Sequence, residues 1–391
     1  MSKPMRELTP SVRMKFRRNF RAFTRGVMPM RNTRVVVAMS GGVDSSVAAA
    51  LLVEQGYEVI GITMCFNFSD GSRKSPPCCS PQAIEDARRV AHKLGIKHYV
   101  LNLQKALQEK VIVEFCAEYL AGRTPNPCVR CNQFIKFGEL LKKAISLDAR
   151  YLATGHYAKI GVKRQGSRGK EVFFLEKAKD QFKDQSYFLY RLNQNQLKHT
   201  LFPLGYYTKT EVRELARKFN FAVAEKPGSQ EICFLPGNDY HKFLKNYTGK
   251  EFSPGSVINR EGEVLGEHKG IALYTIGQRE GLGIAWRHPL YITKIDARKN
   301  TITVGAKEEA FQKEFLVKDV HFTGSMPKKK IAASVKIRYN HREVRAVLLP
   351  VKNKIMVRLN EPQFAVTPGQ SAVFYQGDEV LGGGIIERVI W

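Results

Sequence analysis

Residues 34–46 read RVVVAMSGGVDSS, an apolar, β-branched run that passes directly into two glycines and several small polar residues. A short run of this kind, without polar alternation, is typical of a buried strand in a parallel sheet. Residues 47–54 then have a helical composition and stop before Gly56, a common C-terminal signal. A strand joined by a glycine turn to a helix is the first part of a βα unit, so we expect an α/β fold.

The alternation of strands and helices continues through the first half of the chain. We predict further strands at 57–64, 98–103 and 151–154, and helices at 81–94, 105–120 and 131–146. Crossover helices between parallel strands cover both faces of the sheet, which predicts a Rossmann-like domain. We assign residues 34–238 to this domain and residues 1–33 to a basic N-terminal arm.

From residue 254 onward the chain consists of short alternating runs separated by glycines, which is typical of all-β structure. The predicted strands lie at 256–258, 274–276, 290–295, 301–304, 332–338, 345–349, 354–359 and 371–375. We expect a small central β-rich domain at 239–305 and a C-terminal β-barrel domain at 306–391, the latter in contact with nucleic acid.

The charge of the chain points to a polyanionic partner. Its 391 residues include 63 Lys and Arg against 36 Asp and Glu, a formal net charge of +27. Nucleic acid is the first candidate partner and an anionic membrane surface the second. No run of about 18 apolar residues occurs, which excludes a transmembrane helix. The basic residues 1–33 have the character of a transit peptide, an RNA-binding arm or an extension upstream of the true start.

The number of cysteines indicates the redox state of the compartment in which the protein works. Seven of them, an odd number, argue against a disulfide scaffold and for a reducing compartment. We therefore expect a cytoplasmic protein, or an organellar one if residues 1–33 are a transit peptide. Cys78 and Cys79 are adjacent and cannot easily bind one metal ion, so we interpret them as bystanders in a loop at 75–81.

The segment Ser40–Ser45 is expected to bind phosphate. It lies between a strand and a helix, where several backbone N–H groups lack intrahelical partners and the helix dipole favours an anion. Gly41 and Gly42 allow close approach of the backbone, and Asp44 is expected to hold Mg²⁺. No lysine follows the glycines, so this is not a Walker loop, and the glycine spacing excludes the dinucleotide fingerprint. A plain glycine-rich turn is the alternative.

Two further loops carry cysteines. Residues 122–137 read GRTPNPCVRCNQFIKF, and Cys131 falls near the first turn of a predicted helix. The helix dipole together with Arg123 and Arg130 should lower the pKa of Cys131 towards a reactive thiolate. Cys233 lies in a second loop beside a lysine, Lys226, although a lone cysteine is more often an inert buried side chain.

The string SGGVDSS between strand and helix closely resembles the loop of the N-type ATP pyrophosphatases, which have an adenine nucleotide alpha hydrolase-like fold. Five motifs narrow this resemblance to the tRNA-specific 2-thiouridylase family. They are GRTPNP with CN and IKF at 122–137, TGHY at 154–157, KDQSYFLY at 183–190, GSQEICF at 228–234 and TPGQSAVFY at 367–375. The match covers the chain from about residue 34 to its end.

The resemblance implies a role for each matching position. Cys131 matches the nucleophile, Cys233 the persulfide-carrying cysteine, and Asp44 a catalytic residue of the ATP loop. The implied ATP-binding residues are Ala38, Met39, Ser40, Gly41, Gly42, Val43, Asp44, Ser45, Met64 and Gly155. The implied tRNA-binding residues are Asn126, Pro127 and Cys128 beside the target base, with His156, Lys183, Asp184, Gln185, Arg338, Tyr339 and Gln370.

The resemblance also implies a reaction. ATP, with Mg²⁺, adenylates the 2-oxygen of the wobble uridine; sulfur carried on Cys233 displaces AMP, and a Cys131–Cys233 disulfide remains. The products are 2-thiouridine, AMP and pyrophosphate. The implied partners are tRNAs for Lys, Glu and Gln, and a sulfur donor such as a cysteine desulfurase or a sulfur-relay protein. No membrane is implied.

Cys128 departs from the family pattern, in which many members have an aspartate there. Cys128, Cys131 and Cys233 form a three-thiolate set that resembles the iron–sulfur-dependent tRNA thiolases, whose [4Fe-4S] cluster is held by three cysteines. Zinc is disfavoured because no fourth ligand is evident. The remaining alternative is that Cys128 replaces the aspartate and no metal binds. If these cysteines hold a cluster, the persulfide roles do not apply.

Two other functions compete with this interpretation. An ATP pyrophosphatase that acts on a small molecule would need neither the charge of +27 nor the three cysteines. A non-catalytic RNA-binding protein would need the charge but not the ATP loop.

Overall fold

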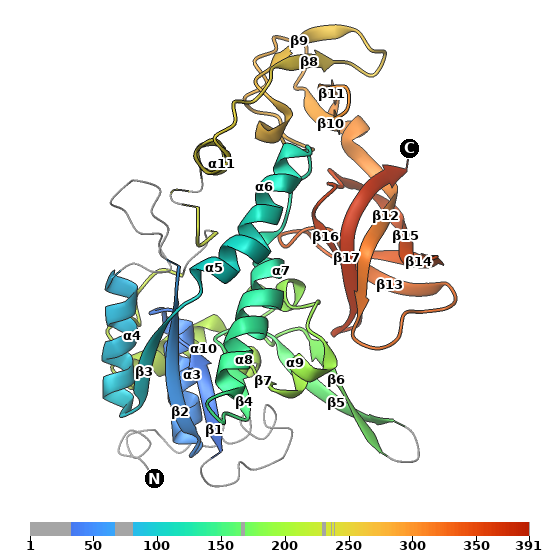
Figure 1. Cartoon of the computed structure of the whole chain (residues 1–391). Coiled ribbons are helices and arrows are strands. Elements are labelled where there is room, and N and C mark those ends of the chain that lie inside the picture. Colours follow the sequence, from blue (N-terminus) through green and yellow to red (C-terminus); the bar gives the residue numbers. More distant parts are fainter. Residues whose placement is uncertain are drawn as a thin grey trace. The chain divides into compact units, whose positions relative to one another are not determined.

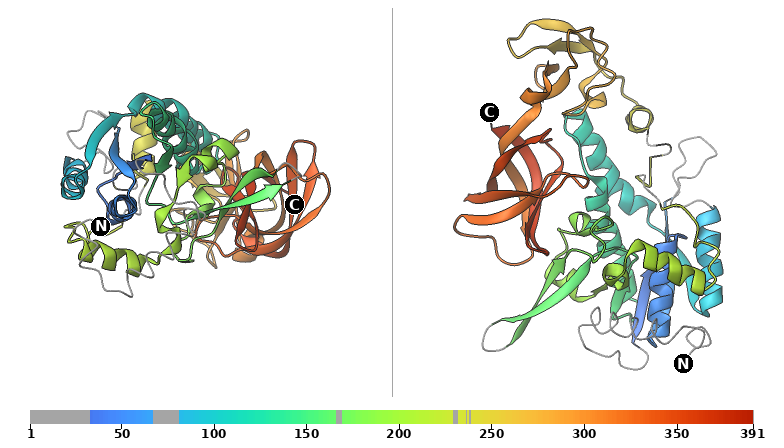
Figure 2. Two further views of the ribbon diagram at one scale, coloured as in Figure 1. Left: turned by 90° about the horizontal axis from the view of Figure 1, so that it is seen from below. Right: turned by 180° about the vertical axis from the view of Figure 1, so that it is seen from behind.

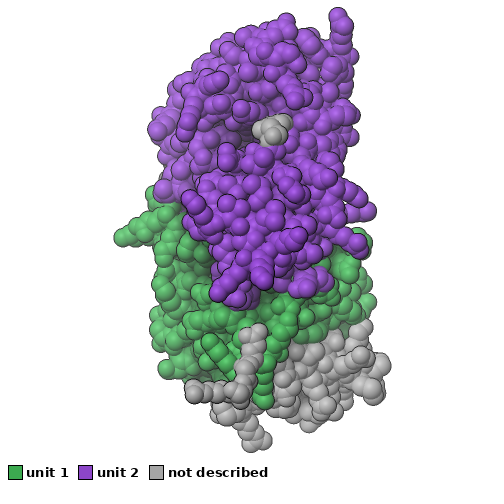
Figure 3. All heavy atoms as spheres, turned by 90° about the vertical axis from the view of Figure 1, so that its right-hand side faces the viewer, with its two compact units in different colours: residues 1–110, 128–238, 378–380 green, residues 111–127, 239–377, 381–391 purple. Residues whose placement is uncertain are grey.

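The computed structural model describes residues 33–66, 81–165, 169–228, 232–235, 237 and 239–390. Nearly all of the basic arm expected at 1–33, together with Cys78 and Cys79, lies outside these described residues. The chain divides into two compact units that are discontinuous in sequence (Figure 3). Unit 1 comprises residues 1–110, 128–238 and 378–380, and unit 2 comprises residues 111–127, 239–377 and 381–391.

Unit 1 is built on a five-stranded parallel sheet with the order β3-β2-β1-β4-β7 (Figure 1). The strands are β1 (Arg34–Ala38), β2 (Glu58–Cys65), β3 (Lys97–Asn102), β4 (Tyr151–Ala153) and β7 (Thr200–Leu201). The side chains of Val35, Val36 and Val37 are completely buried. Burial on both faces explains why β1 is an unbroken apolar run.

Helices cover both faces of this sheet (Figure 2). The helices α3 (Val43–Glu54), α4 (Pro81–Leu94) and α10 (Lys209–Lys218) share one apolar core with β1. The other face is covered by a continuous helical segment made of α7 (Pro127–Arg130), the π-helix η3 (Cys131–Leu140) and α8 (Leu141–Ile145), and α8 packs on β4. π-helical turns are rare and are often found at functional sites.

Unit 1 also contains a hairpin, β5 (Lys159–Gln165) and β6 (Lys170–Glu176), whose second strand pairs with Glu379 and Val380. The shorter elements of this part of the chain are α5 (Gln104–Leu107), η2 (Gln108–Ile112), η4 (Ser186–Phe188), α9 (Gln194–Lys198) and η5 (Pro203–Tyr206).

Unit 2 contains two separate β structures. A four-stranded sheet has the order β10-β11-β8-β9, and a six-stranded barrel has the order β12-β15-β14-β13-β16-β17 and is closed by pairing of β12 with β17. The sheet strands are β8 (Gly255–Ile258), β9 (Val264–His268), β10 (Tyr291–Asp296) and β11 (Thr301–Gly305). The barrel strands are β12 (Phe311–Phe322), β13 (Ile331–Lys336), β14 (Val344–Val351), β15 (Lys354–Phe364), β16 (Ser371–Gln376) and β17 (Glu379–Ile390). The helices are α6 (Val113–Leu120), α11 (Tyr240–Thr248), η7 (Ile271–Leu273) and η8 (Lys307–Ala310).

The structure confirms the predicted fold class, with a parallel α/β sheet, a small β-rich module and a C-terminal barrel. The strand predicted at 274–276 is wrong, because this stretch follows η7 as irregular backbone. Tyr274 and Ile276 are nevertheless buried in the core of the module, which explains their alternating pattern. Within the described part of the chain, no helix has the length and apolar character needed to cross a membrane.

Candidate active site

The predicted phosphate loop joins β1 to α3. Gly41 has a left-handed backbone with φ of +70°, and a Cβ atom there would lie 2.2 Å from the backbone oxygen of Ala83 in α4. Only glycine therefore fits between the loop and α4. Gly42 is the N-cap of α3, so the amides that follow begin the helix without intrahelical acceptors, which suits an anion.

The serines of the loop mainly brace its shape. The hydroxyl of Ser45 accepts a hydrogen bond from the backbone N–H of Ser40 at 3.1 Å and donates to the carbonyl of Gly42 at 3.2 Å. The hydroxyl of Ser46 also donates to Gly42, at 2.9 Å. Both serine side chains are buried. These bonds hold the loop in one conformation before any ligand binds.

The remaining predicted nucleotide positions lie at the same edge of the sheet. Ala38 ends β1 and Met64 lies near the end of the neighbouring strand β2. Met39 continues from β1, and its N–H donates to the carbonyl of Ile62 at 2.9 Å. The carboxyl ends of parallel strands are where ligands bind in such sheets.

Residues 154–157, the TGHY motif, contact this loop from the end of β4. A Cβ atom at Gly155 would lie 2.7 Å from the backbone nitrogen of Ser45, so Gly155 packs directly on the first turn of α3. Tyr157 is buried, and its hydroxyl donates to Oδ1 of Asp44 at 2.8 Å. Burial, followed by the charge of Asp44, holds the pKa of Tyr157 above its usual range, so the phenol stays a donor.

Asp44 is paired with a lysine that the sequence analysis missed. Nζ of Lys209 lies 2.6 and 2.7 Å from the two carboxylate oxygens of Asp44. Three donors engage the two carboxylate oxygens, Tyr157 and Lys209 on Oδ1 and Lys209 on Oδ2, and the role of Asp44 as a Mg²⁺ ligand stays a prediction. A signal was present, because TKTE at 208–211 is a capping box in which Thr208 and Glu211 bond reciprocally at the start of α10. That signal marks Lys209 as the first residue of a helix.

The thiols of Cys128, Cys131 and Cys233 lie close enough to interact electrostatically. Cys128 is on α7 and Cys131 begins η3. Cys131 is buried, whereas Cys128 and Cys233 are half-buried. The fold therefore brings together residues from two loops that are distant in sequence. Residues 229–231 of the GSQEICF motif lie outside the described residues.

The prediction of a lowered pKa at Cys131 is wrong. Burial raises the pKa of Cys128 to about 11 and that of Cys131 to about 12. The two arginines have other partners: Arg123 Nε donates to Glu118 at 2.7 Å, and Arg130 Nη1 lies 3.4 Å from Oε1 of Gln133. Desolvation is the largest effect on the pKa of each of these thiols.

Lys136 is the cation that acts on these thiols. Its charge lowers the pKa of both Cys128 and Cys131, against the larger effect of burial. Cys131 and Lys136 occupy positions i and i+5 of the π-helix η3, where hydrogen bonds join residues at that spacing, so they lie on successive turns. Nζ of Lys136 is 3.4 Å from Nε2 of His156.

His156 is a neutral acceptor for Lys136. Burial, then the charge of Lys136, holds the pKa of His156 well below its usual value. Nδ1 lies 2.7 Å from Oγ1 of Thr154, so the hydrogen-bond pattern assigns the ring proton to Nδ1 and leaves Nε2 to accept from Lys136. Gly155 and Tyr157 thus touch the phosphate loop, while His156 between them touches the cation beside the thiols.

The three cysteines do not form a recognisable metal site. Among the described residues, which include all three, no group of three or more His, Cys, Asp or Glu side chains is arranged to hold a metal ion. The described residues thus show no iron–sulfur site, and the cluster that the resemblance implies stays a prediction.

Three of the predicted tRNA contacts in unit 1, Lys183, Asp184 and Gln185, are consecutive residues that make hydrogen bonds in one turn. Lys183 N–H donates to Oδ1 of Asp180 at 3.2 Å. Asp184 is buried and accepts from the N–H of Ala178 at 2.9 Å, so it braces the turn. Gln185 exchanges two hydrogen bonds with the backbone of Tyr157, which links this turn to the TGHY segment.

The predicted tRNA contacts in unit 2 lie beside two barrel strands, Arg338 and Tyr339 after β13 and Gln370 before β16. Arg338 donates to the carbonyl of Ala365 at 2.9 Å, and Tyr339 lies under Nζ of Lys336. Gln370 donates to the carbonyls of Thr124 and Pro125 at 2.9 and 3.2 Å. Gln370 therefore holds the backbone just ahead of the predicted base-side residues, Asn126 and Pro127. The structure assigns these groups structural contacts, and their contact with tRNA remains a prediction.

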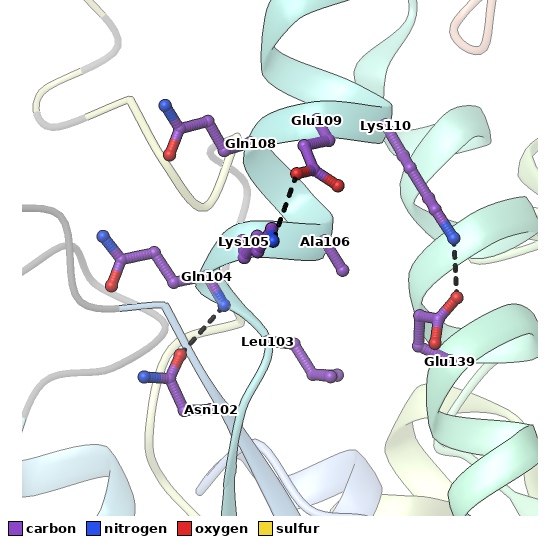
Figure 4. A pocket seen from close by; sticks show the side chains of 9 residues that line it. All are labelled: Asn102, Leu103, Gln104, Lys105, Ala106, Gln108, Glu109, Lys110 and Glu139. Atoms are coloured by element: carbon purple, nitrogen blue, oxygen red, sulfur yellow. Dashed lines mark hydrogen bonds and ion pairs between the residues drawn. The ribbon is translucent and has the colours of Figure 1, made fainter.

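A separate cavity of about 580 Å³ lies at the end of β3 (Figure 4). Its lining includes two ion pairs, Lys105 with Glu109 and Lys110 with Glu139. None of the predicted site residues lines it, so it is not part of the candidate active site.

The chain is similar to known proteins along most of its length. The chain matches three family models: the tRNA methyl transferase HUP domain at residues 33–237, the tRNA methyl transferase PRC-barrel domain at 241–306 and the aminomethyltransferase beta-barrel domain at 312–386. It is 50% identical over 366 residues to tRNA-specific 2-thiouridylase MnmA 1 of Thermoanaerobacter pseudethanolicus, covering 92% of this chain and 99% of the relative.

A second relative, tRNA-specific 2-thiouridylase MnmA of Halothermothrix orenii, is 53% identical over 91% of this chain and 99% of its own length. Among solved structures, the U34-tRNA thiolase NcsA from Methanococcus maripaludis with its [4Fe-4S] cluster shows a TM-score of 0.37 and 18% identity, over 60% of this chain and 73% of that one. Identity of about half over nearly the full length of two relatives, together with the matching domain models, establishes that the chain belongs to the tRNA-specific 2-thiouridylase family.

Proposed function

We propose that this protein is a tRNA-uridine 2-sulfurtransferase that uses ATP to convert the wobble uridine of tRNA to 2-thiouridine. The observation that carries the proposal is the TGHY segment in a chain of this family. Gly155 and Tyr157 contact the phosphate loop, and His156 contacts Lys136 beside the thiols. One four-residue segment therefore connects the ATP-binding part of the site with the sulfur chemistry.

The first half of the reaction activates the uridine. The 2-oxygen of the base attacks the α-phosphorus of ATP, pyrophosphate leaves, and the oxygen becomes part of a good leaving group, AMP. The amides at the start of α3 and the glycines of the loop support the phosphates. We expect Mg²⁺ to accompany the triphosphate as the usual partner of its oxygens.

The second half delivers sulfur. The terminal sulfur of a persulfide on Cys233 attacks C2 of the uridine, and the C2–O bond to AMP breaks. The thiolate of Cys131 then attacks the sulfur of Cys233, the persulfide S–S bond breaks, and 2-thiouridine is released. A Cys131–Cys233 disulfide remains and needs a dithiol reductant to restore both thiols. Lys136 stabilises the thiolate that Cys131 must form.

A persulfide relay is preferred here to an iron–sulfur cluster. The described cysteines do not form a metal-binding group. A cysteine desulfurase or a sulfur-relay protein is the expected sulfur donor. The formal charge of +27 supports tRNA as the substrate, and a reducing compartment such as the cytoplasm suits free thiols.

The test is a complete reaction with tRNA, ATP and a persulfide donor. We expect AMP and pyrophosphate to form only when tRNA is present, and the uridine to gain the mass difference between sulfur and oxygen. Cys131→Ser should still form the adenylate but should give no 2-thiouridine. Pyrophosphate release that is independent of tRNA would favour a small-molecule substrate. Stoichiometric iron and acid-labile sulfide in anaerobically purified protein would overturn the persulfide relay.

A further inference from the structure

Lys209 brings a cation to a phosphate loop that has none in its own sequence. Its Nζ lies 2.6 Å from Oδ1 and 2.7 Å from Oδ2 of Asp44. The side chain of Lys209 is 18% exposed and that of Asp44 is 32% exposed. The pair is therefore partly shielded from water and still open to a ligand.

The backbone fixes where this ammonium group lies. Lys209 is the first residue of α10, and its N–H donates to Oδ2 of Asp180 at 2.8 Å. The preceding Thr208 caps the helix together with Glu211. Because α10 and α3 share one apolar core, the lysine side chain is held at the N-terminal end of α3.

The negative charge of Asp44 repels a bound triphosphate unless a cation compensates the carboxylate. Its carboxylate lies at the N-terminal turn of α3, where the amides and the helix dipole would otherwise favour the phosphates. Tyr157 holds Oδ1 of Asp44 with its hydroxyl, and Nζ of Lys209 lies 5.9 Å from the centre of the same tyrosine ring. An ammonium group has three donors, so its two contacts with Asp44 leave a third for a phosphate oxygen.

We propose that Lys209 binds the β- and γ-phosphates of the nucleotide, and that Asp44 and Tyr157 hold its ammonium group in position for this contact. Lys209 thus serves this loop as the lysine of a Walker loop does, although it lies 165 residues after Asp44. Asp44 is then a positioning residue, because its carboxylate holds the ammonium group through both oxygens. The inference rests on the proposed function only in taking ATP as the nucleotide.

The test compares equilibrium binding of ATP and AMP to the full chain, in EDTA and in Mg²⁺. Lys209→Met removes the charge at similar length and should weaken ATP binding by about tenfold or more in both solutions, since a charge-assisted bond is lost. AMP lacks the two outer phosphates, so its affinity should change by less than about twofold. Lys209→Arg keeps the charge and should retain more ATP affinity than Lys209→Met. Unchanged ATP affinity in Lys209→Met, or equal weakening of ATP and AMP, would overturn the proposal.

Two further variants separate positioning from simple charge effects. Asp44→Asn should weaken ATP binding, and the double variant should bind ATP no more weakly than Lys209→Met alone. Tighter ATP binding by Asp44→Asn would show that Asp44 only repels the phosphates and would overturn its positioning role. Lys179→Met is the matched control, because Lys179 pairs with both oxygens of Glu211 on the same helix, and it should keep wild-type ATP affinity. No tRNA is needed, so failure of thiolation would contradict the proposed function without contradicting this inference.

Discussion

Burial controls the chemistry of the cysteines at the scale of single residues. The sequence places Arg123 and Arg130 next to Cys131, but each arginine has another partner in the fold. The effective cation, Lys136, was visible in the IKF motif, yet its contact depends on the π-helical spacing of η3. Ordinary helical periodicity does not predict that spacing. The sequence therefore identified these cysteines as site residues, but it did not predict that their pKa values are raised.

The raised pKa values predict a loss of stability in alkaline solution. Between the ordinary cysteine pKa of 9.0 and about 12, the unfolded chain loses the Cys131 proton while the folded chain keeps it. The unfolded state then binds fewer protons, so the free energy of unfolding falls as pH rises through this range. Denaturant titrations at pH values below and above 9.0 measure this slope. Cys131→Ser should flatten it, and an unchanged slope would contradict the assigned burial effect.

The lowered pKa of His156 predicts that the free energy of unfolding falls in acid solution. Its folded pKa lies well below the usual 6.5, so below that pH the unfolded chain takes up a proton that the folded ring refuses. Stability contributed by His156 is therefore present above pH 6.5 and is lost as pH falls. Unfolding titrations of His156→Gln should show a smaller loss in acid than wild type. His92→Gln, on the exposed face of α4, is the control and should behave as wild type.

At the scale of elements, the strand–loop–helix unit around residues 34–54 followed from sequence because its signals are local. The hairpin β5–β6 and the helix α10 were missed, although 208–211 carries a capping box. Both elements depend on partners far along the chain: β6 pairs with β17, and Lys209 of α10 pairs with Asp44. The phosphate loop of the nucleotide site could thus be predicted from the sequence, whereas the contribution of Lys209 from α10 could not.

Gly155 gives a test of how the TGHY segment packs on α3. Gly155→Ala places a Cβ atom 2.7 Å from the backbone nitrogen of Ser45, so either the segment or the loop must move. We expect a loss of about 1–3 kcal/mol in the free energy of unfolding, together with weaker ATP binding. Denaturant titration and nucleotide binding measure the two effects. Gly324→Ala is the control, since its added Cβ meets no atom within 4 Å.

At the scale of the whole molecule, the charge excess sets the expected behaviour towards tRNA. Residues 1–34 hold ten Lys or Arg and one acid, which is a third of the net +27. We expect the logarithm of tRNA affinity to fall linearly with the logarithm of salt concentration, because bound counterions are released. A variant that lacks residues 1–33 shows whether the arm contributes, through a shallower slope. A salt-independent affinity in the full chain would contradict an electrostatic interface.

The strand β17 has a consequence for how the protein is made. Unit 1 includes residues 378–380, and β6 acquires its neighbours Glu379 and Val380 only from the last stretch of the chain. During translation this edge of β6 stays uncovered until the ribosome has added residues 379 and 380. Nascent chains stalled before β17 should therefore bind chaperones through this open edge, and release of the final strand should end that binding.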